Sequence, residues 1–337
     1  MTEQEREKMA KIYYDEDADL NLVKDKCIAI LGYGNQGRSQ ALNMRDSGVK
    51  NVIVGNREDE SYEQAKEDGF PVYSIEEATS MADVIFVLLP DEACPEVYNT
   101  LMKPNFRKEV LLNFASGYNL TFRNIELPKD SDVVMAAPRM LGQGVREMYL
   151  SGEGYPAFVA VAQDVSGRAL EYAKALCKAI GATKKGAIEG KIDDETYLDL
   201  MTELGVLPLV YKVFAEAFRL EVEMGHSEEA VLTEAYLSRE MAFLWEQAAE
   251  RGLFRQLCLH SHTAQYAQLK RFGEADDHMI RSFLKEAYES IRSGEFNREW
   301  QDEQKVHKLA HLDELREKAL QTDVTKAEDR LKKRLKC

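Results

Sequence analysis

The stretch Cys27-Ile28-Ala29-Ile30-Leu31-Gly32-Tyr33-Gly34-Asn35-Gln36-Gly37 decides the fold of this chain. An apolar run of strand character breaks into the pattern G-x-G-x-x-G, and residues 38–45 have helical character. In a dinucleotide site the first glycine permits a tight turn, the second lets the backbone approach a pyrophosphate, and the third lets helix pack against strand. The free N–H groups at the helix N-terminus favour an anion. We therefore predict a dinucleotide site formed by Gly32, Tyr33, Gly34, Asn35, Gln36 and Gly37.

Further apolar runs follow at the spacing of β-α-β units, at residues 51–55, 83–90, 110–114, 132–138 and 156–161. Residues 167–180 have helical periodicity and end at Gly181, a good C-terminal stop. From about residue 190, strand patterns give way to long helical patterns at 194–224, 228–251, 262–272, 276–293 and 300–318. We predict a Rossmann doubly wound α/β domain over residues 1–187, followed by an all-α domain over residues 188–337.

Two local features of the second half carry predictions of their own. Pro208 should kink the first long helix or mark a break in it. The strongly charged residues 323–337 indicate a solvated helix or a frayed tail.

The bulk composition restricts the class of protein. The 337 residues are 45% hydrophobic and 31% charged, which suits about two folded domains. The net charge of −15 opposes attraction to nucleic acid or to an anionic membrane, so neither is a predicted partner. No apolar run reaches the roughly 20 residues that span a bilayer, and residues 1–11 lack a signal-peptide core. Five scattered cysteines without C-x-x-C indicate reduced thiols in a cytoplasmic protein.

The loop after the second strand, Gly55-Asn56-Arg57-Glu58-Asp59-Glu60-Ser61, bears on the choice of cofactor. An acidic residue at this place accepts hydrogen bonds from the ribose hydroxyls of NAD and repels the extra phosphate of NADP. We therefore predict that NAD(H) is favoured over NADP(H), with Glu58 or Asp59 on the ribose and Arg57 and Ser61 beside them. Two alternatives stay open: a merely solvated loop, and an Arg57 that stacks on adenine or holds a 2′-phosphate.

Carboxylates on the predicted helices offer a metal site. Asp199 and Glu203 lie four residues apart among apolar neighbours, so they share one helix face. Oxygen ligands of this kind suit Mg²⁺. The alternative is an exposed acidic stripe. The next helix offers Glu234 and Glu240.

Taken together, these residues resemble the ketol-acid reductoisomerases, the enzymes of branched-chain amino acid synthesis, over roughly residues 11–305. The resemblance is carried by Lys11-Ile12-Tyr13-Tyr14-Asp15, Asp17-Ala18-Asp19-Leu20, the glycine motif, Leu88-Leu89-Pro90-Asp91-Glu92, Ala137-Pro138, Glu195-Thr196 with Asp199-Leu200 and Glu203, and Ser293-Gly294 with Phe296 and Arg298-Glu299-Trp300.

The resemblance implies a Rossmann domain, a knotted helical C-terminal domain, and a homodimer or larger assembly. It also implies a small 2-keto or 2-hydroxy acid substrate of the acetohydroxy-acid type, with two Mg²⁺ ions that assist an alkyl shift and a hydride transfer. Leu89 and Pro90 would then belong to the cofactor site. Asp199 and Glu203 match the first metal-ligand pair, and Ser261 matches the serine that holds the substrate carboxylate.

The chain also departs from the family pattern. The family's Ala-His-Gly-Phe is Ala115-Ser116-Gly117-Tyr118 here, and its Pro-Lys is Pro138-Arg139. We therefore place Ser116 and Arg139 among the catalytic candidates.

The second glutamate pair, donated by the partner subunit, falls on Tyr236 and Glu240 in one alignment and on Glu234 and Ser238 in the other. We favour the first, because it needs no gap before Ser261. A tyrosine is a poor Mg²⁺ ligand, because its pKa near 10 keeps it protonated.

The two histidines beside Ser261 complete the set of candidates. His260 or His262 could replace the lost histidine as an acid or base, since an unperturbed imidazole titrates near the working pH. The alternative is two polar loop histidines without a chemical role.

Three functions remain open at this point: a working reductoisomerase, a reductase of the same fold that acts on a different carbonyl substrate without the isomerase step, and a catalytically silent nucleotide-binding homologue. The intact glycine turn and the retention of Asp199, Glu203, Glu240 and Ser261 argue against the last.

Overall fold

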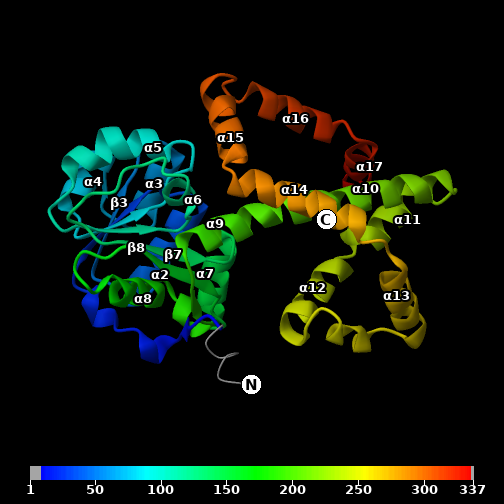
Figure 1. The fold of residues 1–337 in the computed structure, drawn as a ribbon, viewed down its shortest axis with the longest axis horizontal. Coiled ribbons are helices and arrows are strands. Elements are labelled where there is room, and N and C mark those ends of the chain that lie inside the picture. The colour runs from blue at the N-terminus through cyan, green and yellow to red at the C-terminus, as the bar shows by residue number, and fades with distance from the viewer. Residues whose placement is uncertain (1–8, 335–337) are drawn as a thin grey trace. The chain divides into compact units, whose positions relative to one another are not determined.

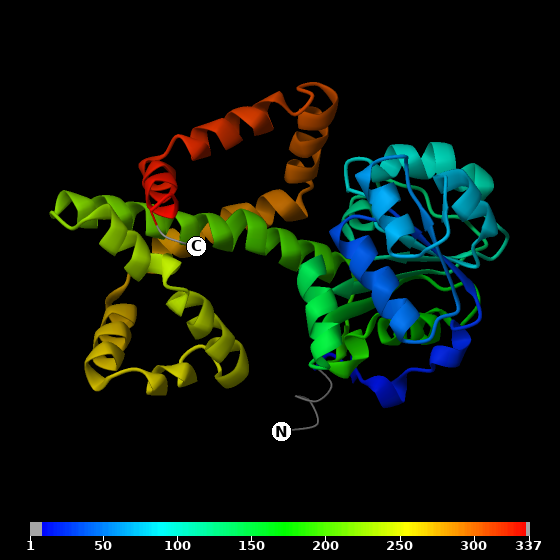
Figure 2. The same cartoon turned by 180° about the vertical axis from the view of Figure 1, so that it is seen from behind.

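A computed structural model of the protein describes residues 9–334. The chain forms two compact units, Met1–Leu198 and Asp199–Cys337 (Figures 1 and 2). Most of the stretch 1–11, which was predicted to lack a signal-peptide core, lies outside the described residues, as does Cys337. Within the described part, the cysteine thiols are free, and no helix combines the length and the apolar character that a membrane span requires.

The first unit is built on one nine-stranded sheet with the order β1-β9-β8-β7-β6-β5-β2-β3-β4. The strands from β7 through β6, β5, β2 and β3 to β4 run parallel, whereas β8 runs antiparallel to β7 and β1 to β9. Their bounds are β1 (Ile12–Tyr13), β2 (Cys27–Leu31), β3 (Asn51–Gly55), β4 (Val72–Tyr73), β5 (Val84–Val87), β6 (Leu111–Phe114), β7 (Val133–Pro138), β8 (Ala157–Gln163) and β9 (Ala187–Glu189).

Helices cover both faces of this sheet. They are α2 (Asn35–Asp46), α3 (Glu60–Glu67), α4 (Ile75–Met81), α5 (Cys94–Val97), α6 (Tyr118–Thr121), α7 (Gly142–Ser151) and α8 (Ala169–Ile180), with a π-helical turn η3 (Tyr98–Met102). Along β2, Ile28 and Ile30 pack with residues of α2, α7 and α8, whereas Ala29 and Leu31 pack with residues of α4 and η3. Successive side chains of a strand point to opposite faces, so both faces are buried. The predicted doubly wound sheet is confirmed.

The differences from the sequence prediction lie at the ends of elements. Helix α2 begins at Asn35 instead of residue 38, because Gly34 is the N-cap and the turn residues already belong to the helix. Gly181 ends α8 with φ +89°, the left-handed conformation that glycine adopts readily. The unpredicted strands β1, β4 and β9 are too short for a periodic pattern. The predicted domain boundary after residue 187 falls within β9, whereas the compact units separate after Leu198.

The second unit is helical in its described part, as predicted. Helix α9 (Ile192–Met201) begins in the first unit, and its last residues belong to the second; it leads into a π-helical turn, η6 (Thr202–Val206), and then α10 (Leu207–Glu223). The remaining helices are α11 (Glu228–Leu232), α12 (Glu240–Arg251), α13 (His262–Glu274), α14 (His278–Arg292), α15 (Glu295–Lys305), α16 (Ala310–Leu320) and α17 (Asp323–Lys332), with a second π-helical turn, η7 (Thr233–Leu237).

Irregular turns interrupt two of the predicted long helices. Pro208 has no N–H group, and directly before it the N–H of Leu207 donates to the carbonyl of Thr202 in the wider π pattern. The break predicted at Pro208 is therefore present. The predicted helix 228–251 is not continuous, because Arg239 has φ +64° between η7 and α12. Nothing in the amino-acid pattern signals this left-handed residue, since an arginine rarely adopts it.

Of the two alternatives predicted for residues 323–337, the described part forms a helix and not a frayed tail, but this helix is not wholly solvated. Helix α17 buries Ala327 and Leu331 in a cluster with Phe218 of α10 and with Val231 and Leu232 of α11. Its charged face is also paired, since Arg330 forms a salt bridge with Glu228. Two apolar residues within a highly charged sequence do not distinguish a packed helix from a solvent-exposed one, so the sequence did not reveal this contact.

Candidate functional site

The turn between β2 and α2 has the geometry of an anion site. Gly32 has φ +94°, and a Cβ there would lie 2.5 Å from the carbonyl oxygen of Leu88. A Cβ on Gly37 would lie 2.0 Å from the carbonyl oxygen of Gly32. A Cβ on Gly34, in contrast, would meet no atom within 4 Å. Two glycines therefore serve close packing, whereas the middle one leaves open space in front of the helix N-terminus, where backbone N–H groups favour negative charge.

Other predicted members of this turn have structural partners of their own. The side chain of Tyr33 is buried, and its hydroxyl donates to Asp68 Oδ2 at 2.9 Å. Burial and this carboxylate both raise the pKa of the Tyr33 phenol. Gln36 Nε2 donates to the carbonyl oxygen of Met140 at 2.8 Å. The ring and hydroxyl of Tyr33 therefore fix the turn. Leu89 and Pro90 follow β5, next to the Leu88 carbonyl that faces Gly32.

The loop after β3 is organised by Asp59, which is the N-cap of α3 and accepts from the N–H groups of Ser61 and Tyr62. Arg57 Nε donates to Asp59 Oδ2 at 2.7 Å, and this bond holds the pKa of the Asp59 carboxyl below its usual range. Glu58 is exposed. Asp59 therefore caps helix α3 and binds Arg57. Of the two carboxylates, Glu58 is the more available to accept a hydrogen bond from a ribose.

The loop and the glycine turn are tied together by Asn56, which sequence reasoning missed. Its Oδ1 accepts from the N–H of Tyr33 at 3.2 Å, and its Nδ2 donates to Asp59 Oδ1 at 2.8 Å. A cavity of about 560 Å³ lies along the same elements and is lined by Tyr33, Gly34, Asn35, Arg38, Ser39, Leu42, Ser61, Gln143, Arg146 and Glu147. Arg38, Gln143 and Arg146 were not predicted. Of these three residues, only Arg38 could have been predicted from the sequence, because it directly follows the glycine motif.

Arg139 and the Gly117 amide, next to Ser116, belong to one polar network centred on Glu195 of α9. Glu195 is 3% exposed; its Oε1 accepts from Arg139 Nη1 at 2.8 Å and its Oε2 from the N–H of Gly117 at 2.7 Å. A Cβ on Gly117 would lie 2.6 Å from Thr196 Oγ1, so the segment packs closely on α9. The Arg139 guanidinium also lies 5.2 Å from the centre of the Phe158 ring. Ser116 is half-buried, and its Oγ accepts from the N–H of Tyr118. Glu195 therefore fixes Arg139 directly, and it holds the backbone of the residue after Ser116.

The metal-ligand candidates lie on helices of the second unit. Asp199 is half-buried in the last turn of α9, and Glu203 is exposed four residues later in η6. Residues four apart lie about one helical turn from each other, so these carboxylates suit a shared hydrated cation. Glu240 is exposed at the first position of α12. No group of three or more His, Cys, Asp or Glu side chains suited to a metal is present among residues 9–334.

Tyr236, the other member of the favoured second pair, is oriented toward the interior of its unit. Its hydroxyl donates to Glu328 Oε1 of α17 at 2.5 Å, and its ring packs edge-on against Phe214. Burial and the Glu328 carboxylate raise the pKa of this phenol. Tyr236 therefore stays protonated, and the donor set fits one carboxylate pair better than two.

The segment His260-Ser261-His262 lies at the start of α13. Ser261 is the N-cap, and its Oγ accepts from the N–H of Ala264 at 3.2 Å. His260 Nε2 lies 3.2 Å from Gln256 Oε1, and His262 is exposed. Ser261 therefore has a structural role that the sequence prediction did not weigh.

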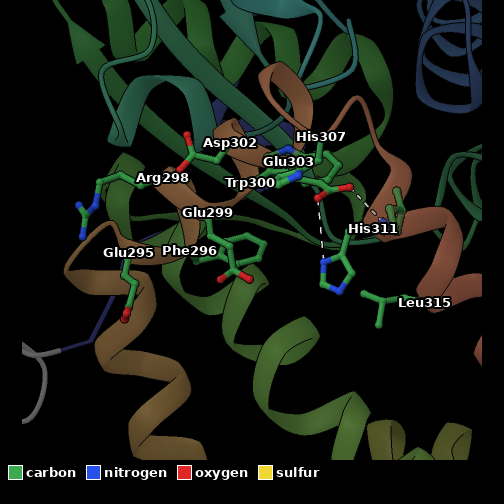
Figure 3. Close-up of a pocket in the computed structure, with 11 residues that line it drawn as sticks. Glu295, Phe296, Arg298, Glu299, Trp300, Asp302, Glu303, His307, His311 and Leu315 are labelled. Carbon is green, nitrogen blue, oxygen red and sulfur yellow. Dashed lines mark hydrogen bonds and ion pairs between the residues drawn. The ribbon is translucent and has the colours of Figure 1, made fainter.

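A second cavity, of about 760 Å³, lies along α15 and α16 and includes Phe296, Arg298, Glu299 and Trp300 (Figure 3). At its inner end, Glu303 Oε1 accepts from the N–H of Leu312 at 3.0 Å, and Glu303 Oε2 lies 4.0 Å from His311 Nδ1 (Figure 3). A carboxylate at a helix N-terminus satisfies an otherwise unpaired N–H. These contacts join the two helices and account for Glu303 structurally.

Comparisons with known proteins match both units. Residues 22–186 match the family model "Acetohydroxy acid isomeroreductase, NADPH-binding domain", and residues 192–336 match "Ketol-acid reductoisomerase, C-terminal domain". The chain is 42% identical to putative ketol-acid reductoisomerase 3 of Saccharolobus solfataricus, covering 95% of this chain and 97% of the relative.

Two further relatives have names that state different cofactors. The ketol-acid reductoisomerase (NADP(+)) of Pyrobaculum aerophilum is 44% identical, over 88% of this chain and 90% of its own. The solved structure of an NADH-preferring ketol-acid reductoisomerase from an uncultured archean superposes with a TM-score of 0.91 at 36% identity, over 97% of this chain and 100% of that one.

Proposed function

Because this chain belongs to the ketol-acid reductoisomerase family, we propose that it converts a small acetohydroxy acid by an alkyl shift followed by reduction with NAD(P)H, assisted by Mg²⁺. The observation that carries the cofactor half of this proposal is the turn at Gly34, which keeps open space before the N-terminus of α2. The network of Glu195 with Arg139 and Gly117 supports a polar substrate site in the same unit.

Charge at the adenosine end supports a preference for NAD(H). Arg57 is paired with Asp59, while Glu58 remains exposed to accept from a ribose hydroxyl. The 2′-phosphate of NADP(H) would meet these carboxylates at an energetic cost. One solved relative is described as NADH-preferring, whereas other relatives carry NADP(+) in their names, so the preference is to be measured on this chain.

Asp199 and Glu203 would hold a Mg²⁺ ion, with Glu240 as a further oxygen ligand. Such an ion supplies Lewis-acid polarisation of the substrate oxygens. Tyr236 adds no carboxylate, and its hydroxyl is bonded to Glu328. This supports a second cation site that is weaker than the first.

The side chains of the chain itself would bind and orient the substrate. Arg139 offers a cationic group for a carboxylate or a developing negative oxygen, and Glu195 holds its guanidinium in place. Ser116 is too weak an acid to replace a histidine as proton donor, so His260 or His262 remains the candidate for that task. Ser261 would hold the substrate carboxylate through its hydroxyl.

A second copy of the chain is the proposed partner. The second unit exposes many large apolar side chains, among them Tyr211, Val213, Met224, Phe243, Trp245, Leu253, Tyr266, Phe272 and Met279. Exposed apolar side chains that gather on one surface mark sites of contact with another protein. A homodimer or larger homo-oligomer would cover it.

An alternative function is reduction without the alkyl shift. It is favoured by the Tyr236–Glu328 bond and by serine at position 116, since the rearrangement makes the heaviest demand on metal ions and acid–base groups. A silent nucleotide-binding homologue is the third possibility, and the formed glycine turn and Glu195 network count against it.

One experiment separates these functions. Oxidation of NADH and of NADPH is followed with 2-acetolactate and with 3-hydroxy-3-methyl-2-oxobutyrate, with and without Mg²⁺, for the wild type and for Asp199→Asn, with Asp25→Asn as a matched surface control. Mg²⁺-dependent turnover of both compounds supports the proposed reaction. Turnover of the second compound alone supports the reductase, and turnover of neither contradicts both enzymatic functions for this substrate class.

A further inference from the structure

Arg38 lines the same cavity as Gly34 and Ser61, but its guanidinium is already paired with the carboxylate of Asp68. Its Nε donates to Asp68 Oδ2 at 2.7 Å, and its Nη2 donates to Asp68 Oδ1 at 3.0 Å. The pair is bidentate, the strongest geometry for an arginine and a carboxylate. The Asp68 side chain is only 14% exposed, whereas that of Arg38 is 47% exposed, so the arginine faces the cavity and the carboxylate lies behind it.

Asp68 is also held from its other side. The Tyr33 hydroxyl donates to Asp68 Oδ2 at 2.9 Å, and Gln64 Nε2 lies 3.4 Å from Oδ1. The carbonyl oxygen of Asp68 accepts from Arg45 Nη1 at 2.6 Å. With this many partners, Asp68 cannot follow Arg38 if the guanidinium moves toward a ligand. Moving Arg38 would therefore break both of its bonds to a largely buried carboxylate.

Arg57, in the loop after β3, is likewise bonded to a fixed carboxylate. Its Nε donates to Asp59, which is itself fixed as the N-cap of α3. Both arginines close to the ribose loop therefore have a carboxylate that offsets their charge. The ribose hydroxyl of NAD(H) needs only an acceptor there, whereas the 2′-phosphate of NADP(H) carries about −1.5 to −2 charge at pH 7 and needs uncommitted cations.

We propose that Asp68 is a specificity-determining residue, which disfavours NADP(H) by keeping the Arg38 guanidinium from a 2′-phosphate. The proposal rests on the dinucleotide site proposed above and deepens it. Asp68 lies after α3, outside the loop of residues 55–61 in which sequence reasoning placed cofactor choice. Asparagine would offer Arg38 one amide oxygen in place of two carboxylate oxygens, so it would free one of the two donors beside Ser61 and leave the charge of the guanidinium without a counter-charge.

The test measures binding of ADP-ribose and of 2′-phospho-ADP-ribose to the full chain by calorimetry, so it does not depend on catalysis. The variants are Asp68→Asn, Arg38→Gln, the double variant, and Asp25→Asn as a matched control for a surface carboxylate paired with Lys50. Asp68→Asn should improve the affinity for the phosphorylated ligand, relative to ADP-ribose, at least tenfold. Arg38→Gln and Asp25→Asn should leave that ratio within twofold, and the double variant should lose the gain.

Two results overturn the proposal: an unchanged ratio in Asp68→Asn, or a gain that persists in the double variant, which would mean that Asp68 repels the phosphate directly. Asp68→Ser repeats the test with a smaller uncharged side chain, in case the asparagine variant fails to fold. If the wild type binds neither ligand, the dinucleotide site itself is refuted. If it binds ADP-ribose but the ratio does not move, only the role of Asp68 fails.

Discussion

Alanine should have different effects at the second and third glycines of the turn. At Gly34 it should weaken binding of the dinucleotide, and at Gly37 it should destabilise the fold. Gly34 has φ −77°, which alanine adopts, and a Cβ there meets no atom within 4 Å. We expect Gly34→Ala to fold with a stability within about 1 kcal/mol of the wild type, since a poorer N-cap is offset by a less flexible unfolded chain. Its Cβ would, however, occupy the space of the pyrophosphate. Losing one hydrogen bond to a charged phosphate costs about 1.5–3 kcal/mol, which is a roughly 10- to 150-fold weaker affinity.

Gly37→Ala should damage the fold before it damages binding. Its Cβ would lie 2.0 Å from the carbonyl oxygen of Gly32, closer than the 3.0 Å that real Cβ atoms keep, so α2 has to move away from β2. Overpacking of this kind costs about 3 kcal/mol, and the melting temperature should fall by about 6–12 °C for a domain of this size. Gly273→Ala is the control, because its Cβ also meets nothing within 4 Å and it lies in α13 of the other unit.

Calorimetric titration with NADH and thermal melting are run on all three variants. The reasoning is refuted if Gly34→Ala binds NADH within twofold of the wild type, because a side chain would then occupy no space that the ligand needs. A Gly37→Ala variant that melts with the wild type would contradict the close packing of α2 on the turn.

Three further predictions concern the polar networks. Glu195→Ala should destabilise the first unit by about 2–4 kcal/mol and speed hydrogen exchange at the Gly117 amide, and unchanged exchange there would contradict the bond to Glu195. Tyr236→Glu should raise Mg²⁺ affinity at least fivefold in calorimetry, whereas Tyr236→Gln should not; equal affinities would exclude position 236 as a ligand position. Arg38 holds the pKa of Asp68 below its ordinary value of 3.8, so the pair stabilises the protein fully above pH about 4 and less as the pH falls through the folded-state pKa. The stability gap between wild type and Asp68→Asn should therefore shrink in acid, and a gap independent of pH would contradict the ion pair.

The sheet could be predicted because its strands are buried on both faces. Continuous apolar runs such as 27–31 and 51–55 indicate buried strands of a parallel sheet and not segments of buried helix, because a glycine turn follows the first of them. The short strands β1, β4 and β9 could not be predicted, because two or three residues carry no periodicity. The break at Arg239 was missed for another reason: tertiary contacts of η7 outweigh the local preference of arginine against φ +64°.

The site residues divide in a similar way. The glycine motif could be identified from the sequence, because the backbone of this turn would contact the ligand and only glycine permits its conformation and close packing. Asn56, Asp68 and Glu195 act through partners that are 23, 35 and 78 residues away in the chain. No spacing rule connects such pairs, so only the folded chain reveals them.

The departures from the family pattern have unequal chemical consequences. Arginine at position 139 keeps the positive charge. Its Nη1 donates to Glu195 while the same guanidinium lies over the Phe158 ring, so the cation is held from two sides. Tyrosine at position 236 instead removes a carboxylate, and its hydroxyl donates a hydrogen bond to Glu328, which fastens α17 to the turn before Glu240. The first change leaves a means of stabilising a developing negative oxygen, which hydride transfer needs. The second removes charge from the proposed metal site, on which the alkyl shift depends most. If one half-reaction of the proposed pair is slow in this protein, it should therefore be the rearrangement, and added carboxylate at position 236 should restore that half alone.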